Sequence, residues 1–533
     1  MQAKLHYFFL LIFLAFQNIL NAQSEENKRP TDIQHYQFEI TVNDTTNIIE
    51  GIATISFKPK TPNNDLNLDF SSKNNEGKGM SVKKVLLNNE PVSFRHHNDQ
   101  LIIPTNKILT DSLQICKVTY QGIPQDGLII SKNKFGDRTF FADNWPDRAH
   151  NWIPCVEDLS DKAYVDFIVK APNYYQVIAN GSLKEKVNIN DNYTLHHYAS
   201  KTPLPTDVMV IGIARFAVQN LEEIDQIPVS TWVFPQNKDK GYFDYAQATS
   251  VLDYYIKNIA PFPFSKLANV QSKTRFGGME NASAIFYSER SVTGRRDQET
   301  LIAHEIAHQW FGDSATQTDW SHLWLSEGFA TYFTNLYLEH KYGEEKLKER
   351  MTNERKKVIR FSEKQLTPVI DNTDNYMKLL NANSYEKGAW TLHMLRRKIG
   401  DEMFWKGIRA YYKKYQFSNA DSSDFKNVME DVSGKELDLF FDQWLLGTGQ
   451  PELKLKWKNK KNQTNIIVEQ IQKSETVFQF PLELKLILKD GSSKNEKLSI
   501  NKNRQEFMVP GSSKVKEIII DPNVNLLYKS ANQ

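Results

Sequence analysis

The stretch Thr300-Leu301-Ile302-Ala303-His304-Glu305-Ile306-Ala307-His308-Gln309-Trp310-Phe311-Gly312-Asp313 decides how the rest of this chain is organised. Residues four apart share one face of a helix, so His304 and His308 present two imidazoles to a single ion, with Glu305 beside them. Apolar residues recur at helical spacing, no proline interrupts the run, and Gly312 is a typical stop signal. The pattern predicts a buried helix that carries two metal ligands.

A second apolar run, residues 324–333, supplies a candidate third ligand. A catalytic zinc ion usually takes three protein ligands and keeps a fourth position for water. Glu327 lies inside this helix-like run, nineteen residues after His308. We therefore expect His304, His308 and Glu327 to hold one zinc ion. The alternative is a core helix with two hydrogen-bonded histidines, which the downstream glutamate disfavours.

These residues resemble the gluzincin signature, specifically that of the zinc aminopeptidases of the aminopeptidase N and leukotriene hydrolase family. A second motif of that family appears upstream, as Gly277-Gly278-Met279-Glu280-Asn281, and the likeness extends over nearly the whole chain. The resemblance implies a multidomain α+β fold. Its parts would be an N-terminal all-β, saddle-like domain, a thermolysin-like and mostly helical catalytic domain, and a small C-terminal β-sandwich. It also implies one Zn²⁺ per chain and peptide substrates with a free N-terminus.

Composition limits the partners. The chain has 533 residues, which predicts two to four domains. Its 66 Lys and Arg nearly balance 64 Asp and Glu, so neither nucleic acid nor an anionic membrane is expected as a partner. Cys116 and Cys155 are the only cysteines. A disulfide between them is open, although two small buried thiols are expected.

Residues 1–22 have the pattern of a secretory signal peptide. Lys4 precedes an apolar run over residues 7–16, and Ala22 offers a small residue before a cleavage point at Gln23. The run is too short to span a membrane as a stable helix, and an uncleaved amphipathic anchor is the alternative. The sequence thus predicts an exported protein without membrane insertion.

Periodicity divides the remaining chain into three domains. Residues 23–233 read as a β domain, because Tyr36, Phe38 and Ile40 alternate with polar residues. Residues 234–447 read as the catalytic domain, with helices predicted over 242–259, 343–361, 384–399, 421–432 and 435–446. After the break Gly447-Thr448-Gly449-Gln450-Pro451, residues 452–533 read as a β-sandwich with a hairpin turn at Asp490-Gly491. Many members of the family carry a large helical domain beyond this point, for which the sequence leaves no room. A more open cleft, or closure by a second subunit, is then expected.

Two residues are candidates for catalysis. Glu305 cannot turn to the metal from its place after His304, so it faces the water, and we expect it to act as general base and then as proton donor. The family places an oxyanion-stabilising tyrosine within a Ser-Tyr-x-Lys-Gly-Ala run. Asn383-Ser384-Tyr385-Glu386-Lys387-Gly388-Ala389 matches this run and nominates Tyr385. Without the resemblance, Tyr385 would be read as a packing residue.

The motif Gly277-Gly278-Met279-Glu280-Asn281 is the candidate substrate-binding strand. Paired glycines let another backbone approach closely, which indicates an edge strand against which the substrate lies. The Glu280 carboxylate would then bind the free α-ammonium of a peptide, because a desolvated charge pair rewards a free N-terminus. This arrangement predicts an exopeptidase. The alternative is a Gly-Gly turn with an exposed glutamate.

Some positions depart from the family pattern. Ser326 replaces a common asparagine, and Thr334 stands where many relatives have a glutamate that supports a zinc histidine. Asp313 or Asp319 is expected to support a histidine instead. The family often places a glutamine or glutamate of the β domain near the substrate amine. Here alignment puts Trp145 at that place, with Asp143 and Asn144 nearby.

The motifs and the resemblance that they carry lead us to expect a secreted zinc aminopeptidase. An epoxide hydrolase of the leukotriene hydrolase kind is one alternative, which would need a deep apolar tunnel. A non-catalytic peptide-binding protein is another. The presence of all the ligands, the base and the two accessory residues disfavours it.

Overall fold

The computed structural model describes residues 30–61, 65–105, 110–511 and 514–531. The chain divides into two compact units, Met1–Lys132 with Gly136–Arg215 and Asn133–Phe135 with Phe216–Gln533. The predicted signal peptide lies outside the described residues. Within the described part of the chain, no helix is both long and apolar enough to cross a membrane.

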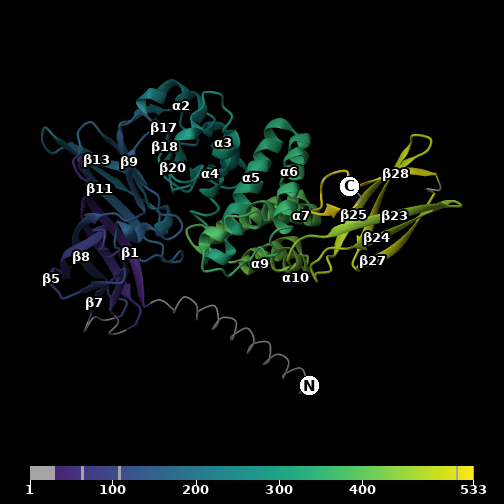
Figure 1. Ribbon diagram of the computed structural model, residues 1–533, viewed down its shortest axis with the longest axis horizontal. Coiled ribbons are helices and arrows are strands. Elements are labelled where there is room, and N and C mark those ends of the chain that lie inside the picture. Colours follow the sequence, from purple (N-terminus) through teal and green to yellow (C-terminus); the bar gives the residue numbers. More distant parts are fainter. Residues whose placement is uncertain (1–29, 62–64, 106–109, 512–513, 532–533) are drawn as a thin grey trace, which may run out of the picture. The chain divides into compact units, whose positions relative to one another are not determined.

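The first unit consists of β-sheets, drawn in purple and blue in Figure 1. Its largest sheet has the strand order β13-β14-β11-β1-β2-β8-β4-β5, and smaller sheets have the orders β12-β15-β10-β9 and β3-β7-β6. In the largest sheet β1 and β11 run parallel, whereas the other neighbours are antiparallel. The strands are β1 Thr31–Thr41, β2 Ile49–Pro59, β3 Leu66–Asp69, β4 Gly79–Leu87, β5 Glu90–Pro91, β6 Arg95–His97, β7 Gln100–Ile103, β8 Gln114–Ile123, β9 Leu128–Lys132, β10 Arg138–Ala142, β11 Tyr164–Pro172, β12 Gln176–Ala179, β13 Ser182–Asn188, β14 Tyr193–Ala199 and β15 Ile211–Ala214.

Alternating burial explains why these segments form strands. Tyr36, Phe38 and Ile40 on β1 are at most 1% exposed, while the residues between them are partly exposed. Period-two burial of this kind is what a half-buried strand requires, and the prediction for this segment is confirmed. Cys116 and Cys155 are both buried and free, as expected.

The second unit begins before the boundary predicted at residue 233. Strands β16 (Ala217–Asn220) and β17 (Val229–Val233) belong to a sheet of order β16-β17-β18-β20-β19. β17 pairs in parallel with β18, and its backbone hydrogen bonds therefore tie it to the unit that follows. Local periodicity identifies a strand but not its partner, so the break at Arg215 was not visible in the pattern.

Helices build most of the second unit around this sheet. The remaining strands near it are β18 Leu267–Ser272, β19 Gly278–Met279, β20 Ala284–Ser288, β21 Thr316–Gln317 and β22 Asn419–Ala420. The helices are α2 Lys238–Tyr245, α3 Ala248–Asn258, α4 Glu299–His308, α5 Trp324–Tyr342, α6 Glu344–Ser362, α7 Gly388–Ile399, α8 Asp401–Tyr415, α9 Ser422–Ser433 and α10 Asp438–Phe441, with π-helical turns at Asn383–Lys387 and Asp442–Leu446.

Three helix predictions differ from the structure in detail. The segment 242–259 forms the two helices α2 and α3 instead of one. The metal helix α4 ends at His308 and does not continue to Gly312, whose φ of +130° places it in a turn. The segment 384–399 starts with a π-helical turn. The pattern also does not single out α8, which Gly400 at φ +91° separates from α7.

The C-terminal residues form a sandwich of two sheets with the orders β27-β24-β23-β29 and β26-β25-β28, drawn in yellow in Figure 1. Leu482, Leu484 and Leu486 face its core, and Gly491 adopts φ +87° in the hairpin turn, as predicted. The strands are β23 Glu452–Lys460, β24 Gln463–Gln470, β25 Phe480–Leu488, β26 Ser493–Ile500, β27 Arg504–Pro510, β28 Val515–Ile520 and β29 Lys529–Ser530.

Candidate active site

Helices α4 and α5 bring the three predicted metal ligands together. His304 Nε2 lies 3.1 Å from His308 Nε2 and 3.2 Å from Glu327 Oε2, and His308 Nε2 lies 3.3 Å from the same oxygen. Ligand atoms about 2.0–2.1 Å from one ion in tetrahedral geometry are separated by roughly 3.3 Å. The spacing therefore fits a single zinc-sized ion bound by all three side chains.

Aromatic packing fixes the two helices against each other. The Phe311 ring, just beyond the end of α4, lies 4.8 Å from the Phe329 ring and 4.9 Å from the Phe333 ring on α5. Ile302 and Ile306 on α4 are fully buried. The Tyr255 hydroxyl donates to the Ala303 carbonyl, which ties α3 to α4. The ligands thus stand on a rigid apolar support.

Buried carboxylates make the same place attractive to a cation. Glu280 and Glu305 each offer an oxygen within 4.8 Å of a ring nitrogen of His308, and Glu327 approaches it from α5. Burial alone lowers the pKa of His308, but the charges of Glu280 and Glu327 outweigh it and raise this pKa to about 10. A site that draws a proton so strongly onto an imidazole is equally suited to a metal cation.

Glu305 reaches toward this cluster from the buried side of α4, where it is 4% exposed. Burial, followed by the charge of Glu280, raises the pKa of its carboxyl well above the usual range. A Cβ atom on Gly278 would lie 2.3 Å from Glu305 Oε1, so any side chain at that position would displace the carboxylate. The second glycine of the 277–281 motif is therefore required by the space that Glu305 occupies.

Tyr385 joins the cluster from the π-helical turn Asn383–Lys387. Its hydroxyl donates to Glu327 Oε1 at 2.8 Å, and its ring stacks on His304 at 5.9 Å between centroids. Burial and the Glu327 charge raise the pKa of this phenol well above its ordinary value. The hydroxyl therefore remains a donor over the working pH range.

A close contact between two glycines sets the position of Tyr385. Gly328, next to Glu327, packs directly on Gly388, and a Cβ on Gly328 would lie 2.8 Å from Gly388 Cα. Asn383 donates to the Thr367 and Pro368 carbonyls, and Lys387 donates to the Gly447 carbonyl at 3.0 Å. These bonds hold both ends of the π-helical turn.

The 277–281 motif lies at the edge of its sheet, as predicted, where Gly278 and Met279 pair with β20. Gly277 is exposed and Glu280 is 9% exposed, whereas the side chains of Met279 and Asn281 are buried. The motif thus offers backbone and the Glu280 carboxylate, but not the side chains of Met279 and Asn281, to a ligand.

Gln309 is a buried residue of this region that the sequence pattern did not identify. Its amide nitrogen donates to the Glu280 carbonyl and to Asp313 Oδ2, and its amide oxygen accepts from the Ser283 backbone at 2.8 Å. Gln309 therefore holds the segment that carries Glu280 against the end of α4. The sequence feature that could have identified Gln309 is its position directly after His308.

Comparison with known proteins places this geometry in a family. Residues 33–208 match the "Peptidase M1 N-terminal domain" and residues 243–444 match the "Peptidase family M1 domain". The chain belongs to peptidase family M1. Together the two matches cover both the β unit and the helices that carry the candidate ligands.

The M1 relatives include several aminopeptidases. "Probable aminopeptidase 2" of Sulfurisphaera tokodaii is 27% identical over 392 residues, covering 70% of this chain and 49% of that protein. "Aminopeptidase M1" of Arabidopsis thaliana is 26% identical over 419 residues, covering 75% and 47%. The human "Glutamyl aminopeptidase" is 27% identical over 329 residues, covering 58% and 34%. The chain thus spans about half the length, or less, of these relatives.

Within this M1 site, Ser326 supports a histidine where the sequence suggested an aspartate. His308 Nδ1 lies 2.9 Å from Ser326 Oγ and 3.2 Å from the Phe311 carbonyl. Asp313 accepts from Gln309, whereas Asp319 caps the turn at Ser321 and lies 3.9 Å from His322. These contacts fix the His308 tautomer, with Nε2 left for the metal.

Two further positions discussed for the M1 pattern have structural partners. The Thr334 hydroxyl donates to the Ala330 carbonyl of its own helix. In the β unit, Asn144 donates to the Thr206 and Met209 carbonyls and accepts from the Trp152 indole, so its side chain is fully used inside that unit.

Proposed function

We propose that the protein is an exported zinc aminopeptidase that hydrolyses the N-terminal peptide bond of peptides. One observation carries the proposal: the Glu280 carboxylate lies within 4.8 Å of both Glu305 and the ligand histidine His308. An anionic group beside a metal site and a general base is where a substrate ammonium would be held. Aminopeptidase names among the relatives support the same activity.

The reach of the chain then selects the first peptide bond. In any residue the backbone nitrogen lies about 2.5 Å from the carbonyl carbon, whereas the next residue is about 3.8 Å further on. An ammonium bound by Glu280 therefore places the first carbonyl, and not the second, near His308 and Glu305. An internal amide would leave Glu280 unpaired, at a cost of about 1–3 kcal/mol or more.

The geometry supports the following catalytic roles. His304, His308 and Glu327 would hold zinc, which supplies a water of lowered pKa and polarises the carbonyl. Glu305 stands on the buried side of α4, placed to take a proton from the attacking water and return it to the leaving amine. The Tyr385 hydroxyl, which donates to the ligand Glu327, would donate to the developing oxyanion. Gly277 and Gly278 have no side chains, so a substrate backbone could approach this edge strand closely.

We include export in the proposal because residues 1–22 have the pattern of a signal peptide. Their charge and apolar pattern supports cleavage near Ala22. N-terminal sequencing of the protein from the producing cells would show Gln23 as the first residue of an exported form. Recovery of a chain that begins at Met1 from the cytoplasm would contradict export.

The decisive experiment compares aminoacyl fluorogenic amides with the same amides carrying an N-acetyl group, with and without a chelator. We expect only the free-amine substrates to be cleaved, and we expect chelation to abolish and zinc to restore the activity. In the variant E280Q, kcat/KM for free-amine substrates should fall by about 100-fold, because a desolvated charge pair contributes about 2–5 kcal/mol. E349Q, which changes an exposed glutamate of α6, is the matched control.

The outcomes separate the alternatives. Cleavage of acetylated substrates at a comparable rate would mean that Glu280 does not bind an amine and that the protein is an endopeptidase. Stoichiometric zinc without turnover of any substrate would favour a peptide-binding protein.

A further inference from the structure

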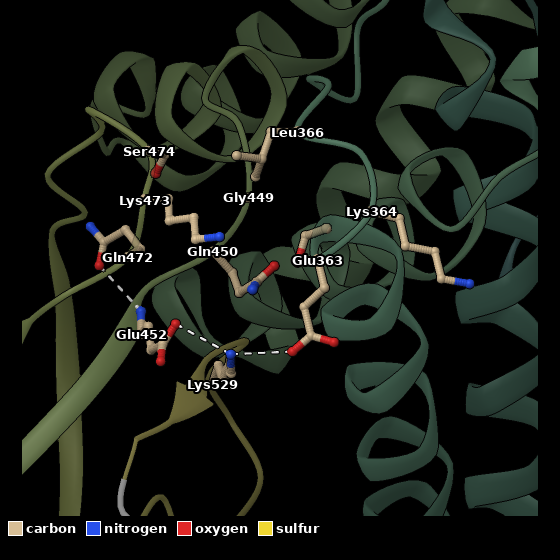
Figure 2. Close-up of a pocket in the computed structure, with 11 residues that line it drawn as sticks. Glu363, Lys364, Leu366, Gly449, Gln450, Glu452, Gln472, Lys473, Ser474 and Lys529 are labelled. Atoms are coloured by element: carbon tan, nitrogen blue, oxygen red, sulfur yellow. Dashed lines mark hydrogen bonds and ion pairs between the residues drawn. The ribbon is translucent and has the colours of Figure 1, made fainter.

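A cavity of about 420 Å³ lies away from the metal ligands, between the end of α6, the linker after α10 and the loop after β24 (Figure 2). This volume is in the range of small-molecule sites. The residues that line it are Ser362, Glu363, Lys364, Leu366, Gly449, Gln450, Glu452, Gln472, Lys473, Ser474 and Lys529.

Gln450 is the residue of this cavity that indicates a bound ligand. The residue is only 6% exposed, yet its side-chain oxygen has no hydrogen-bond partner among the residues that the structure describes. An unsatisfied buried polar atom costs about 1–3 kcal/mol. The hydroxyl of Ser474, also on the wall, is buried and equally lacks a partner in the described chain. A bound molecule that donates a hydrogen bond to the Gln450 side-chain oxygen and accepts one from the Ser474 hydroxyl would satisfy both buried groups.

The charges of the wall indicate the sign of such a molecule. Lys529 is already neutralised by Glu363 at 3.2 Å and Glu452 at 3.4 Å, as the dashed lines in Figure 2 show. Lys364 and Lys473 form no ion pair with any residue that the structure describes. In Figure 2 the Lys473 side chain extends toward Gln450. The unpaired charge at the cavity is therefore positive, and it lies near the unsatisfied amide.

We propose that this cavity binds an α-carboxylate that carries an N–H donor on the adjacent carbon, as in a peptide C-terminus or a free amino acid. The carboxylate bonds to Lys473 and the Ser474 hydroxyl, and the N–H donates to the Gln450 side chain. Leu366, which is 46% exposed and lies on the same wall, offers an apolar surface to the side chain of the ligand. The proposal does not depend on peptidase activity.

Calorimetric titration of the full chain tests the proposal, with N-acetyl-L-leucine as the first probe. Its blocked amine removes the ammonium that Glu280 would bind, which disfavours binding at the candidate active site. L-leucinamide lacks the carboxylate and 4-methylpentanoate lacks the N–H donor, and both should bind at least about tenfold more weakly. Titration of L-leucine in the E280Q background distinguishes a free amino acid from an acylated one.

Variants locate the binding. Q450L and K473M should each weaken N-acetyl-L-leucine binding by about tenfold or more. K461M, which changes an exposed lysine elsewhere on the sandwich, should leave the affinity unchanged. Because Lys473 is exposed, K473M keeps the test valid even where Q450L fails to fold. Equal affinity in K473M and wild type, or no heat from any probe up to about 10 mM, would overturn the proposal.

Discussion

His308 depends on a neighbour that no metal-binding motif contains. Ser326 Oγ lies 2.9 Å from His308 Nδ1, and Gly312 leaves the space for this contact, since a Cβ there would lie 2.6 Å from Ser326 Oγ. Groups that bond the outer nitrogen of a ligand histidine orient the ring and increase its basicity. Ser326 therefore orients a residue of the candidate metal site without being one of the three expected ligands.

We predict that S326A weakens zinc binding by about tenfold while retaining the fold, because the Phe311 carbonyl still accepts from His308. Competition with a fluorescent chelator measures the affinity. T334V is the matched control, since the Thr334 hydroxyl donates to the Ala330 carbonyl of its own helix. An affinity in S326A equal to that of wild type would show that the Phe311 carbonyl is sufficient.

The sequence predicted those residues of the site whose chemistry follows from local spacing. His304 and His308 are one helical turn apart, and their convergence needs no tertiary information. Ser326 and Gln309 act through contacts with residues fifteen or more positions away, Phe311 and Glu280 among them. No spacing rule encodes such contacts, so only the structure assigns them.

At the scale of elements, the crossing of α5 with the start of α7 sets the position of Tyr385. A Cβ on Gly388 would lie 2.9 Å from Gly328 Cα, and the contact is with backbone, which cannot rotate away. The helices approach this closely one residue from Glu327 and three residues from Tyr385. Because Gly328 and Gly388 have no Cβ atoms, the two helices can approach closely enough for Tyr385 to reach Glu327.

We predict that G388A lowers kcat by about tenfold to 100-fold and destabilises the protein by about 1–3 kcal/mol, because the helices must separate. KM should change less, since Glu280 is untouched. Steady-state kinetics and urea unfolding measure the two effects. A control is G434A, which strains a left-handed helix end with open space around it and should cost stability without affecting kcat. Unchanged kcat in G388A would contradict the crossing argument.

Hydrophobic periodicity predicted some of the elements but not others. The pattern located α6, whose buried residues recur at helical spacing, and also α4 and α5, which are buried over most of their length. The π-helical turn before α7 was invisible, since it arises from the Asn383 and Lys387 bonds to distant carbonyls. The strand pairing that moves the unit boundary to Arg215 is likewise a tertiary property.

At the scale of the whole molecule, a buried histidine makes the β unit sensitive to acid. His196 on β14 is 1% exposed, and neither ring nitrogen has a partner among the described residues. Burial, with a smaller effect of Lys186, lowers the pKa of His196 to about 4. In the unfolded chain this histidine takes up a proton near pH 6.5, whereas in the folded chain it does so only near pH 4. Stability is therefore complete above about pH 6.5 and declines as the pH falls toward 4.

We predict that H196F removes up to about 3 kcal/mol of this acid destabilisation, while stability near neutral pH changes little. Urea unfolding at about pH 7.5 and about pH 5 measures the difference between the two conditions. H97F, at an exposed histidine of the same unit, should retain the wild-type pH dependence. A wild-type pH dependence in H196F would show that other groups cause the acid sensitivity.

A buried ion pair joins helix α6 to the sandwich. Arg355 on α6 bonds Asp521 Oδ2 and the Leu526 carbonyl, and its guanidinium lies over the Trp390 and Tyr528 rings at 5.0 and 4.6 Å. Asp521 is 4% exposed, and burial raises its pKa to about 6 even with Arg355 present. Arg355 is the positive charge that faces Asp521, and the Asn525 and Leu526 backbone N–H groups also donate to this carboxylate.

We predict that R355M destabilises the protein by about 3–5 kcal/mol near neutral pH, because it leaves a buried carboxylate unpaired while keeping an apolar stem against the rings. The defect should shrink at about pH 5, where a carboxyl with a raised pKa takes up a proton and loses its charge. The double variant R355M/D521N should recover part of the loss at neutral pH, since it removes the unpaired charge itself. Urea unfolding of the single and double variants at both pH values measures these effects. A loss that is equal at both pH values, or that D521N does not relieve, would mean that Arg355 acts through packing alone.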